Sequence, residues 1–350
     1  MSKTIRAGVI GAGAIGLLHM ESWKKHPHVE LVAVAEINPQ RRNEAIERYP
    51  EMKGYDDYRE MLKDKALDAV SIGVPNYLHA PVALDAIRAG KHVMLDKPMA
   101  TSAAEAQTIV DAVKQMKVQF MVGQNFRFFR DTQMVKKYCA DGYLGDVYHA
   151  RAHWMRRSGI PRIGSWFTQK KFAAGGCCYD LGVHFLDLTL YLLDCFDAEC
   201  VSGLTQARFG PRGLGDGTWG LGEINPDKPF DVEDLAVAMI KLKGGKSVLL
   251  EIGWASHADA GPDRHLHLYG TDGGASLWPA QIHRTKGQSV ETINPDLAQL
   301  PLPEDRLQHF ADCLLNGSEP LVKPEQSLKV QKILDAIYES SRSGHEVRIV

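Results

Sequence analysis

The sequence contains no run of about 18 apolar residues, so it predicts no transmembrane helix. It also has no excess of charge of either sign: over 350 residues the formal net charge is −2. This balance excludes the strongly basic surface typical of proteins that bind nucleic acid or anionic membranes. The six cysteines form no C-x-x-C pair, so we expect free thiols rather than disulfides or a zinc site. Because the first predicted strand begins at Ile5, no room remains for a signal peptide, and we expect a cytoplasmic protein.

Three closely spaced glycines follow a short apolar strand near the start of the chain. The strand ends at Ile10, and Gly11, Gly13 and Gly16 then open an apolar-periodic helix. This G-x-G-x-x-G spacing is typical of a dinucleotide-binding turn: the glycines allow a tight turn, close approach of a pyrophosphate, and close packing of helix on strand. The N–H groups at the helix start would bind the phosphates. A purely structural turn is the alternative. The predicted cofactor contacts here are Gly11, Gly13, Ala14, Ile15 and Gly16.

The next predicted strand ends in an acidic residue. Glu36 lies about 20 residues after the last glycine, where a carboxylate accepts hydrogen bonds from ribose hydroxyls. The same carboxylate repels the 2′-phosphate of NADP, so we expect NAD. Arg41 and Arg42 follow shortly afterwards, and an arginine there can receive that phosphate, which leaves NADP as the less favoured alternative. We include Arg41 among the cofactor candidates.

The pattern of predicted strands and helices changes near residue 125. Before it, apolar strands alternate with helical periods, which predicts a doubly wound parallel sheet, a Rossmann domain over 1–125. After it, many strands follow one another at short spacing, and turns such as 243–245 require antiparallel pairing. We therefore predict an α+β domain over 126–350, built on a largely antiparallel sheet. The long Gly/Pro/Asp-rich stretch 210–231 is interpreted as a functional or interface loop.

Two short segments follow predicted parallel strands of the first domain, and the carboxyl ends of such strands face the ligand crevice. In the first, Asp96 and Lys97 precede Pro98, which would fix the direction of the lysine; a plain surface lysine is the alternative. In the second, Asn76 could bind the cofactor or equally cap the following helix. The cofactor candidates from both segments are Pro75, Asn76, His79, Asp96 and Lys97.

A third cluster lies in the second domain, where two glycines open a helix at GGCCYDLGVH. Asp180 and His184 are four residues apart and so share one helix face, with Asp187 a turn further on. An ordinary helical ion pair is one interpretation. A metal site is another, but hydride transfer to a nicotinamide requires no metal, and we expect none.

Together these motifs resemble the glucose-fructose oxidoreductase, inositol dehydrogenase and rhizopine catabolism family (Gfo/Idh/MocA). The resemblance rests on the glycine turn, on PNYLH, ALDAIRAGKHVMLDKPMA and GGCCYDLGVHFLDL, and on the final SGHEVRI. It implies NAD or NADP on the Rossmann domain, a sugar or polyol substrate, and a C-terminal sheet whose open face forms homo-oligomer contacts. It also implies that Lys97, Asp180 and His184 are catalytic. Asp96 departs from the family's usual glutamate, so its contact with the cofactor is less direct.

The stretch HWMRRSGIPRIGSWF resembles members of the family that act on pyranosides. The candidate substrate contacts are Lys97, Arg127, His153, Arg156, Arg157, Trp166, Asp180 and His184, and Gln124 completes the candidate cofactor contacts. Either arginine of the 156–157 pair could indicate an anionic substrate, but a solvated basic turn is the preferred interpretation.

Oxidation of a secondary alcohol requires a base for the hydroxyl proton and a positive group beside the developing alkoxide. His184 is the candidate base because imidazole changes its charge near neutral pH, Asp180 would orient it, and Lys97 would stabilise the alkoxide. The family also contains enzymes that oxidise C3 of a pyranoside transiently and then cleave the glycoside without net NADH. A sugar-sensing regulator is a further alternative, disfavoured because all three catalytic positions are retained.

Overall fold

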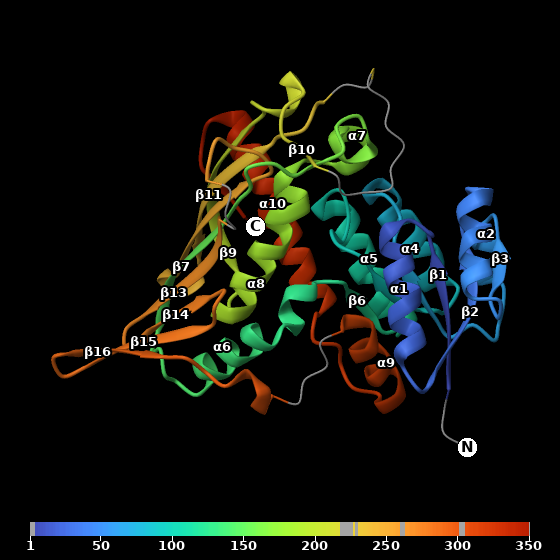
Figure 1. Cartoon of the computed structure of the whole chain (residues 1–350), viewed down its shortest axis with the longest axis horizontal. Coiled ribbons are helices and arrows are strands. Elements are labelled where there is room, and N and C mark those ends of the chain that lie inside the picture. The colour runs from blue at the N-terminus through green and yellow to red at the C-terminus, as the bar shows by residue number, and fades with distance from the viewer. Residues whose placement is uncertain (1–3, 218–226, 228–229, 260–262, 301–304, 350) are drawn as a thin grey trace. The chain divides into compact units, whose positions relative to one another are not determined.

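The computed structural model describes residues 4–217, 227, 230–259, 263–300 and 305–349 (Figure 1). The chain divides into two compact units: Met1–Gly123 with Asp305–Leu328, and Gln124–Glu304 with Lys329–Val350. The second unit begins close to the predicted boundary at 125. Residues 305–328, however, belong to the first unit, whereas the sequence analysis assigned them to the C-terminal domain. Within the predicted loop 210–231, residues 218–226 and 228–229 lie outside the described residues.

A buried aromatic contact explains why a late segment joins the first unit. Helix α9 (Arg306–Asn316) packs on α1 (Ala14–Lys25) and on β1 (Ile5–Ile10). The rings of Trp23 and Phe310 lie 6.4 Å apart, and both side chains are fully buried. The apolar period of α9 was visible in the sequence, but the surface that it covers was not, because nothing local specifies a partner almost 300 positions away.

Within residues 4–123, six strands form one parallel sheet in the order β3-β2-β1-β4-β5-β6. The direction of strand order reverses between β1 and β4, and in doubly wound sheets ligands bind at the carboxyl ends of the strands at such a point. The predicted Rossmann sheet is confirmed. The remaining strands are β2 (Val29–Ala35), β3 (Lys53–Tyr55), β4 (Ala69–Ile72), β5 (His92–Leu95) and β6 (Phe120–Val122).

Local hydrogen bonds set the starts of helices in this unit. The Asn38 side chain accepts a bond from the Arg41 N–H with Pro39 at the first helical position, and the Ser102 hydroxyl accepts one from the Glu105 N–H. The other helices of the first unit are α2 (Pro39–Arg48), α3 (Tyr58–Leu62), α4 (His79–Arg88) and α5 (Ala103–Met116).

Among the described residues of the second unit, nine strands form a mixed sheet in the order β16-β15-β14-β13-β7-β12-β11-β9-β17. Neighbouring described strands are antiparallel except β12 and β7, which are parallel, so the predicted, largely antiparallel sheet is confirmed. The strands are β7 (Val147–Met155), β9 (Ala198–Gln206), β11 (Leu235–Leu242), β12 (Ser247–Gly253), β13 (Asp263–Gly270), β14 (Gly274–Leu277), β15 (Gln281–Lys286), β16 (Ser289–Ile293) and β17 (Val347–Arg348).

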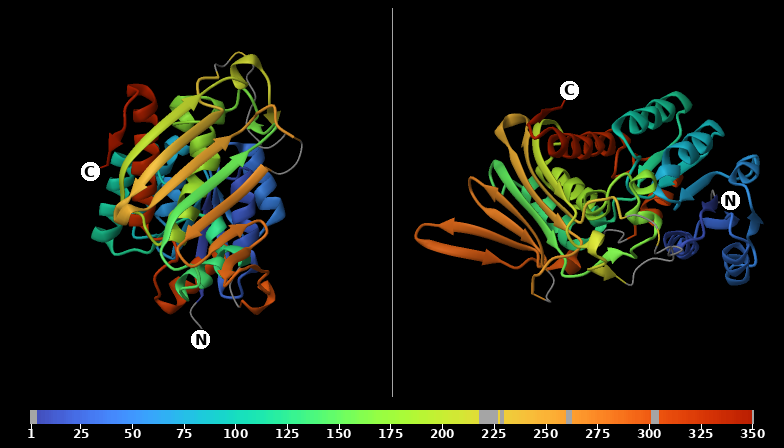
Figure 2. Two further views of the ribbon diagram at one scale, coloured as in Figure 1. Left: turned by 90° about the vertical axis from the view of Figure 1, so that its left-hand side faces the viewer. Right: turned by 90° about the horizontal axis from the view of Figure 1, so that it is seen from above.

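Helices cover one face of this sheet. Figure 1 shows α6 (Arg130–Ala140), α8 (Val183–Leu193) and α10 (Pro324–Ser343) on that side, and Figure 2 (left) shows the strands from the other side, with no helix of the described second unit lying across them. Strand β7 follows this division: Ala150 and Ala152 are fully buried, whereas His149, Arg151 and His153 are partly exposed. We call the face that carries these three side chains the open face.

The remaining elements are short, and several of them carry candidate site residues. No helix in the described part of the chain is both long and apolar enough to cross a bilayer. The short elements are η1 (Asn76–Leu78), η2 (Asn125–Phe128), η3 (Trp166–Thr168), the π-helical turn η4 (Cys178–Gly182), η5 (Gly210–Arg212), η6 (Lys243–Gly245), η7 (Leu297–Gln299), α7 (Lys170–Ala173) and the strand pair β8 (Ile160–Pro161) and β10 (Asp216–Gly217).

Candidate functional site

Two glycines of the G-x-G-x-x-G turn meet a structural requirement of the chain itself, and the third faces open space. Gly11 has φ +92°, which favours glycine, and a Cβ on Gly16 would lie 1.8 Å from the Gly11 carbonyl oxygen. A Cβ on Gly13 would meet no atom of the described chain within 4 Å, so this side of the turn is open. No described side chain caps the start of α1, and its first N–H groups can therefore receive an anion. The turn fits the pyrophosphate of a dinucleotide.

The Glu36 carboxylate is fixed at the end of β2 by backbone hydrogen bonds. It accepts from the Ala12 N–H at 2.7 Å and from the Asn38 N–H at 2.9 Å, and the residue is only 9% exposed. Each carboxylate oxygen retains a further acceptor position for a ribose hydroxyl. The Arg42 guanidinium donates to the Glu36 carbonyl at 2.8 Å, so this arginine already has an intramolecular partner.

Asp96, directly before Lys97, is bound within the first unit. Its carboxylate accepts from Arg306 at 3.1 Å and lies 3.9 Å from the His19 imidazole. His19 is fully buried, and burial, reinforced by Arg306, lowers its pKa to about 3. The predicted contact of Asp96 with the cofactor therefore competes with this internal pairing, which orients the backbone that leads into Lys97.

His79, a predicted cofactor contact, is instead completely enclosed. Its ring nitrogens lie 2.6 Å from the Pro98 carbonyl oxygen and 2.9 Å from that of Val74, so it connects the loop after β4 to the loop that carries Lys97. Burial lowers the pKa of His79, and the neutral ring donates to one of these carbonyls. The structure thus gives His79 a positioning role. The alternative that Asn76 caps a helix is not supported either, because no side chain caps η1 or α4.

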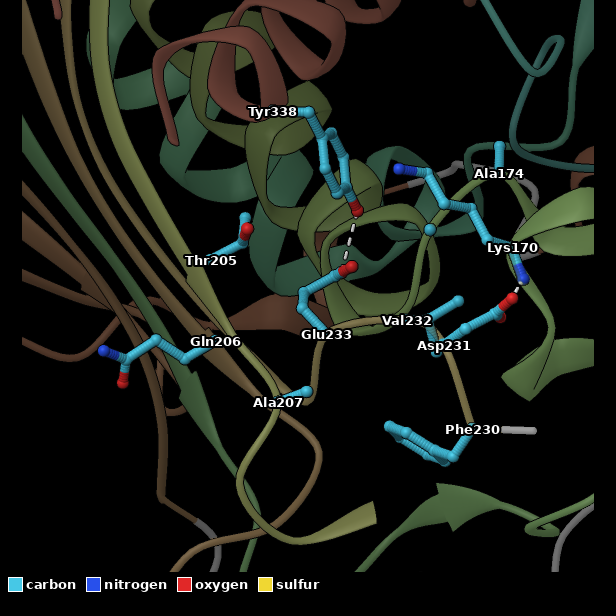
Figure 3. Close-up of a pocket in the computed structure, with 11 residues that line it drawn as sticks. Lys170, Ala174, Thr205, Gln206, Ala207, Phe230, Asp231, Val232, Glu233 and Tyr338 are labelled. Atoms are coloured by element: carbon cyan, nitrogen blue, oxygen red, sulfur yellow. Dashed lines mark hydrogen bonds between the residues drawn. The ribbon is translucent and has the colours of Figure 1, made fainter. Parts of the chain in front are cut away.

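In the second unit, the glycines before Asp180 wrap around a buried carboxylate. Glu233 accepts hydrogen bonds from the N–H groups of Gly176 and Cys178, each at 2.9 Å, and from the Tyr338 hydroxyl at 2.8 Å (Figure 3). Burial raises the pKa of Glu233, and these three donors oppose that shift. A Cβ on Gly176 would lie 1.9 Å from the Glu233 carbonyl oxygen, so this position requires glycine.

This carboxylate also lines a cavity of about 320 Å³ behind the turn. Figure 3 shows Glu233 and Tyr338 pointing toward one another there, with Thr205 beside them and Lys170 next to Asp231. The cavity is lined by the back of the glycine turn, and the side-chain oxygens of Thr205, Asp231, Glu233 and Tyr338 in its lining take part in hydrogen bonds. We therefore interpret it as part of the support for the turn.

Asp180 and His184 follow this turn, but not on one regular α-helix as predicted. Asp180 lies in the π-helical turn η4, and His184 lies at the start of α8. Single π-helical turns occur often at functional sites. The Trp254 indole donates to the Asp180 carboxylate at 2.9 Å, and the His184 ring packs on Phe126 with centroids 5.1 Å apart. Both candidate catalytic side chains are therefore oriented by aromatic residues, and neither is fully buried.

The two arginines that face this part of the second unit lie over an aromatic cluster. Arg156 is 4.6 Å above the Trp154 ring, and Arg264 is 4.4 Å above the Trp278 ring. Burial lowers the pKa of Arg156, and the Asp180 carboxylate opposes that shift. Arg156 thus lies near Asp180, and its contact with a substrate stays a prediction. Arg264 was not predicted.

Four other candidates have different environments. Arg127 is fully buried and donates two hydrogen bonds of 2.7 Å to Asp187, so the structure gives it a structural ion pair in place of the predicted substrate contact. Arg157 is exposed and donates to the Ala258 carbonyl at 3.0 Å, whereas Trp166 stacks on Phe167. Gln124 is buried, and its side-chain carbonyl has no partner among the described residues, which suits a ligand-binding role.

His153 lies away from this group. In β7 it alternates with Trp154, which packs on Phe126 and Phe185 on the helix-covered face. His153 therefore lies on the open face, opposite the side of the sheet on which His184 packs. This arrangement corrects the prediction that His153 contacts the same substrate as His184.

Several residues of this site were not identified from the sequence: Glu233, Tyr338, Trp254 and Arg264. Glu233 lies just before β11 and Trp254 directly follows β12, which is a weak positional signal. Tyr338 and Arg264 lie within regular elements and carry no local mark of function. Their roles depend on packing between segments that are far apart in the chain.

A parallel sheet with a glycine turn open to an anion, and a carboxylate fixed at the end of β2, define a dinucleotide-binding Rossmann domain. Residues 5–124 match the family described as "Oxidoreductase family, NAD-binding Rossmann fold", and residues 132–276 match the "GFO/IDH/MocA C-terminal domain". The chain belongs to the Gfo/Idh/MocA family of oxidoreductases.

Named relatives of this chain include sugar dehydrogenases. The D-glucoside 3-dehydrogenase of Escherichia coli is 28% identical over 350 residues, which cover 99% of this chain and 98% of that protein. The levoglucosan dehydrogenase of Pseudarthrobacter phenanthrenivorans is 29% identical over 288 residues, which cover 77% of this chain and 73% of that protein. A solved structure of levoglucosan dehydrogenase in complex with NADH has the same fold, with a TM-score of 0.85 at 23% identity over 99% of this chain and 100% of that chain.

Proposed function

We propose that this chain is an NAD-dependent dehydrogenase that oxidises a secondary hydroxyl of a sugar, with a pyranoside as substrate. The observation that carries the proposal is the placement of Asp180 by Trp254 beside Arg156, four residues before His184. Because this carboxylate and imidazole are both partly exposed on a rigid aromatic support, they can bind and deprotonate a hydroxyl. The names of the relatives support a sugar as the substrate class.

Three residues of the chain carry separate parts of the proposed reaction. His184 accepts the hydroxyl proton at Nε2, since its Nδ1 atom is buried, and the Asp180 carboxylate stabilises the charged ring. The Lys97 ammonium stabilises negative charge on the same hydroxyl oxygen. Bound NAD supplies the hydride acceptor. The loop that carries Lys97 is held by His79, so the ammonium does not depend on a mobile backbone for its direction.

The choice of NAD over NADP rests on Glu36. Its carboxylate is held in place by two backbone N–H groups, so it cannot turn away from a 2′-phosphate without losing both bonds. Arg42 is bound to the carbonyl of the same residue and is not positioned to neutralise that charge. A ribose with two free hydroxyls is therefore the better match.

The substrate class follows from the aromatic cluster around the site. Trp154 and Trp278 are partly exposed and offer apolar ring surface, while Arg156 and Arg264 above them offer hydrogen-bond donors. Such surfaces suit a pyranose ring, which has apolar C–H faces and hydroxyls at its edge. Both guanidiniums are partly covered by the rings, and we propose a neutral pyranoside rather than a sugar acid.

The open face is the proposed homo-oligomer contact. Three large apolar side chains are exposed there: Leu204 at 52% and Met239 at 42% on the neighbouring strands β9 and β11, and Tyr269 at 41% on β13. Sedimentation velocity on the purified protein and on a Met239→Lys variant tests this. A multimer that the variant dissociates supports the proposal, whereas a wild-type monomer at micromolar concentration contradicts it.

The function is tested by following NADH absorbance with a panel of glucosides, free hexoses, inositols and uronic acids. We expect NADH formation with at least one pyranoside, and turnover at least 10²-fold lower for His184→Ala with NAD binding retained. Consumption of a glycoside without net NADH would replace the dehydrogenase with the glycoside-cleaving alternative. Near-normal turnover by the variant would remove His184 from the mechanism.

A further inference from the structure

A row of polar side chains crosses three adjacent strands on the open face. The strand register places Glu251 of β12 beside His153 of β7, and His153 beside His265 of β13. Asp263 lies two residues before His265 and so shares its face. This arrangement follows from the backbone pairing of the sheet, which fixes which side chains are neighbours.

The side chains of this row converge on one point. The rings of His153 and His265 are stacked, with centroids 4.5 Å apart and planes at 10°. The Asp263 carboxylate lies 2.9 Å from His153 Nε2 and 3.8 Å from His265 Nδ1. One donor atom from each of the three residues lies within 4.8 Å of the others. Two imidazoles and a carboxylate around a common centre form a donor set that borderline divalent metals prefer.

A second observation concerns the other nitrogen of His153. Its Nδ1 atom lies 3.4 Å from the Glu251 carboxylate, which in turn accepts a 2.8 Å bond from the Arg151 guanidinium. Histidine ligands of metals commonly donate their second ring N–H to a carboxylate, which fixes the tautomer and the direction of the ligating nitrogen. Glu251 and Arg151 would orient His153 in this manner, with Nε2 directed toward Asp263.

We propose that His153, Asp263 and His265 bind a divalent transition-metal ion of the zinc class on the open face, with water in a fourth position. A tetrahedral ion with bonds of about 2.0–2.1 Å places its ligand atoms about 3.4 Å apart. The donor atoms of the three side chains reach that separation from the observed one by small side-chain rotations. The site lies on the face opposite His184 and is independent of the proposed dehydrogenase activity. No metal is expected from the sequence, because hydride transfer to a nicotinamide requires none. The two histidines of this site are 112 positions apart, and only the pairing of β7 with β13 joins them.

The ordinary alternative for these residues is a histidine–aspartate ion pair on a polar sheet face. Such a pair requires only one imidazole and does not explain why a second ring stacks on the first beside the same carboxylate. It also assigns no role to the Glu251 contact with His153. Zinc binding distinguishes the two interpretations directly.

The test uses the full-length protein after chelator treatment and dialysis, titrated with Zn²⁺ by calorimetry in the presence of a weak competing chelator. We expect one ion per chain, and affinity at least 30-fold lower in both His265→Ala and Asp263→Asn. His283→Gln is the matched control, since this histidine lies on the same face beyond β14, and we expect wild-type affinity for it. Co²⁺ in place of Zn²⁺ should give the visible absorption of a tetrahedral site in the wild type and in the control.

Unfolding temperatures of the metal-free proteins accompany the titration, so that a loss of binding is not confused with a loss of fold. Absence of stoichiometric binding to the wild type would overturn the proposal. So would an equal loss in His283→Gln, because binding would then reflect scattered surface histidines. Dehydrogenase assays run on the same samples report on the proposed function separately, and failure of one leaves the other standing.

Discussion

Tyr338 donates a 2.8 Å hydrogen bond to the Glu233 carboxylate, which lies beneath the glycine turn that leads to Asp180. Neither residue contacts the proposed substrate region, and both act through the turn. The position of the candidate catalytic pair thus depends on a carboxylate from the segment just before β11 and a hydroxyl from the last helix.

Replacement of Glu233 by Ala should lower kcat by about 10- to 100-fold while the dissociation constant for NAD stays unchanged, because displacement of a catalytic group costs rate rather than cofactor affinity. Glu233→Gln keeps an acceptor for Cys178 and Tyr338 and should recover most of the loss. Steady-state kinetics with the unfolding temperature as companion measurement checks this, and Glu291→Ala on β16 is the exposed control. Equal losses in the Ala and Gln variants would count against a positioning role.

Replacement of Arg127 by Met should destabilise the protein by about 3–5 kcal/mol, because Asp187 would remain buried without its partner. The double variant Arg127→Met with Asp187→Leu should be much less destabilised, since no isolated charge is left. Urea unfolding of the two single variants and the double variant gives the coupling free energy between Arg127 and Asp187. If the decrease in the free energy of unfolding of the double variant equals the sum of the decreases in the two single variants, the ion pair is not the source of the effect.

His19 should make the protein sensitive to mild acid. The pKa of His19 is 6.5 in the unfolded chain and about 3 in the folded chain. The neutral ring therefore contributes fully to the free energy of unfolding above pH 6.5, and this contribution is lost as the pH falls toward 3. From pH 6.5 to pH 5 the loss amounts to roughly 1–2 kcal/mol. Unfolding of wild type and His19→Gln at both pH values should show a smaller decrease for the variant. Parallel decreases would show that His19 titrates normally in the folded chain.

Replacement of Glu36 by Ala should weaken NAD binding by about 10- to 100-fold, the effect of losing charge-assisted hydrogen bonds to the ribose. Binding of NADP should change less, so discrimination between the two cofactors should shrink. Fluorescence titration of wild type, Glu36→Ala and the exposed control Glu44→Ala measures both constants. Tighter binding of NADP than of NAD by the wild type would contradict the proposed preference.

Much of the fold could be predicted because its signals are local. The glycine spacing, the caps at Asn38 and Ser102, and the alternation in β7 each depend on residues within one element or turn. Backbone preferences and hydrogen bonds within such segments do not depend on any tertiary contact. The parallel and antiparallel halves therefore followed from pattern and turn length.

The environments of the site residues could not be predicted, because they depend on contacts distant in sequence. Asp96 pairs with Arg306 across 210 positions, and Arg127 pairs with Asp187 across 60. Both residues were expected to contact ligands, since a charged residue beside a motif looks the same in sequence whether its partner is a ligand or a side chain. The face of the sheet on which His153 lies could not be predicted either. Strand alternation shows that neighbouring residues lie on opposite faces, but not which face the helices cover.

The central claim is that Lys97 and His184 act on one hydroxyl, and the rate of NADH formation in a single turnover tests it most directly. It is measured for wild type, Lys97→Met, His184→Ala and the double variant, all saturated with NAD and with the best pyranoside of the panel. The account predicts that each single variant is slower by about 10²–10⁴-fold and that the double variant is little slower than the worse single one, since groups that act as a unit are not additive. A near-normal rate in either single variant, or losses that multiply in the double variant, would contradict it.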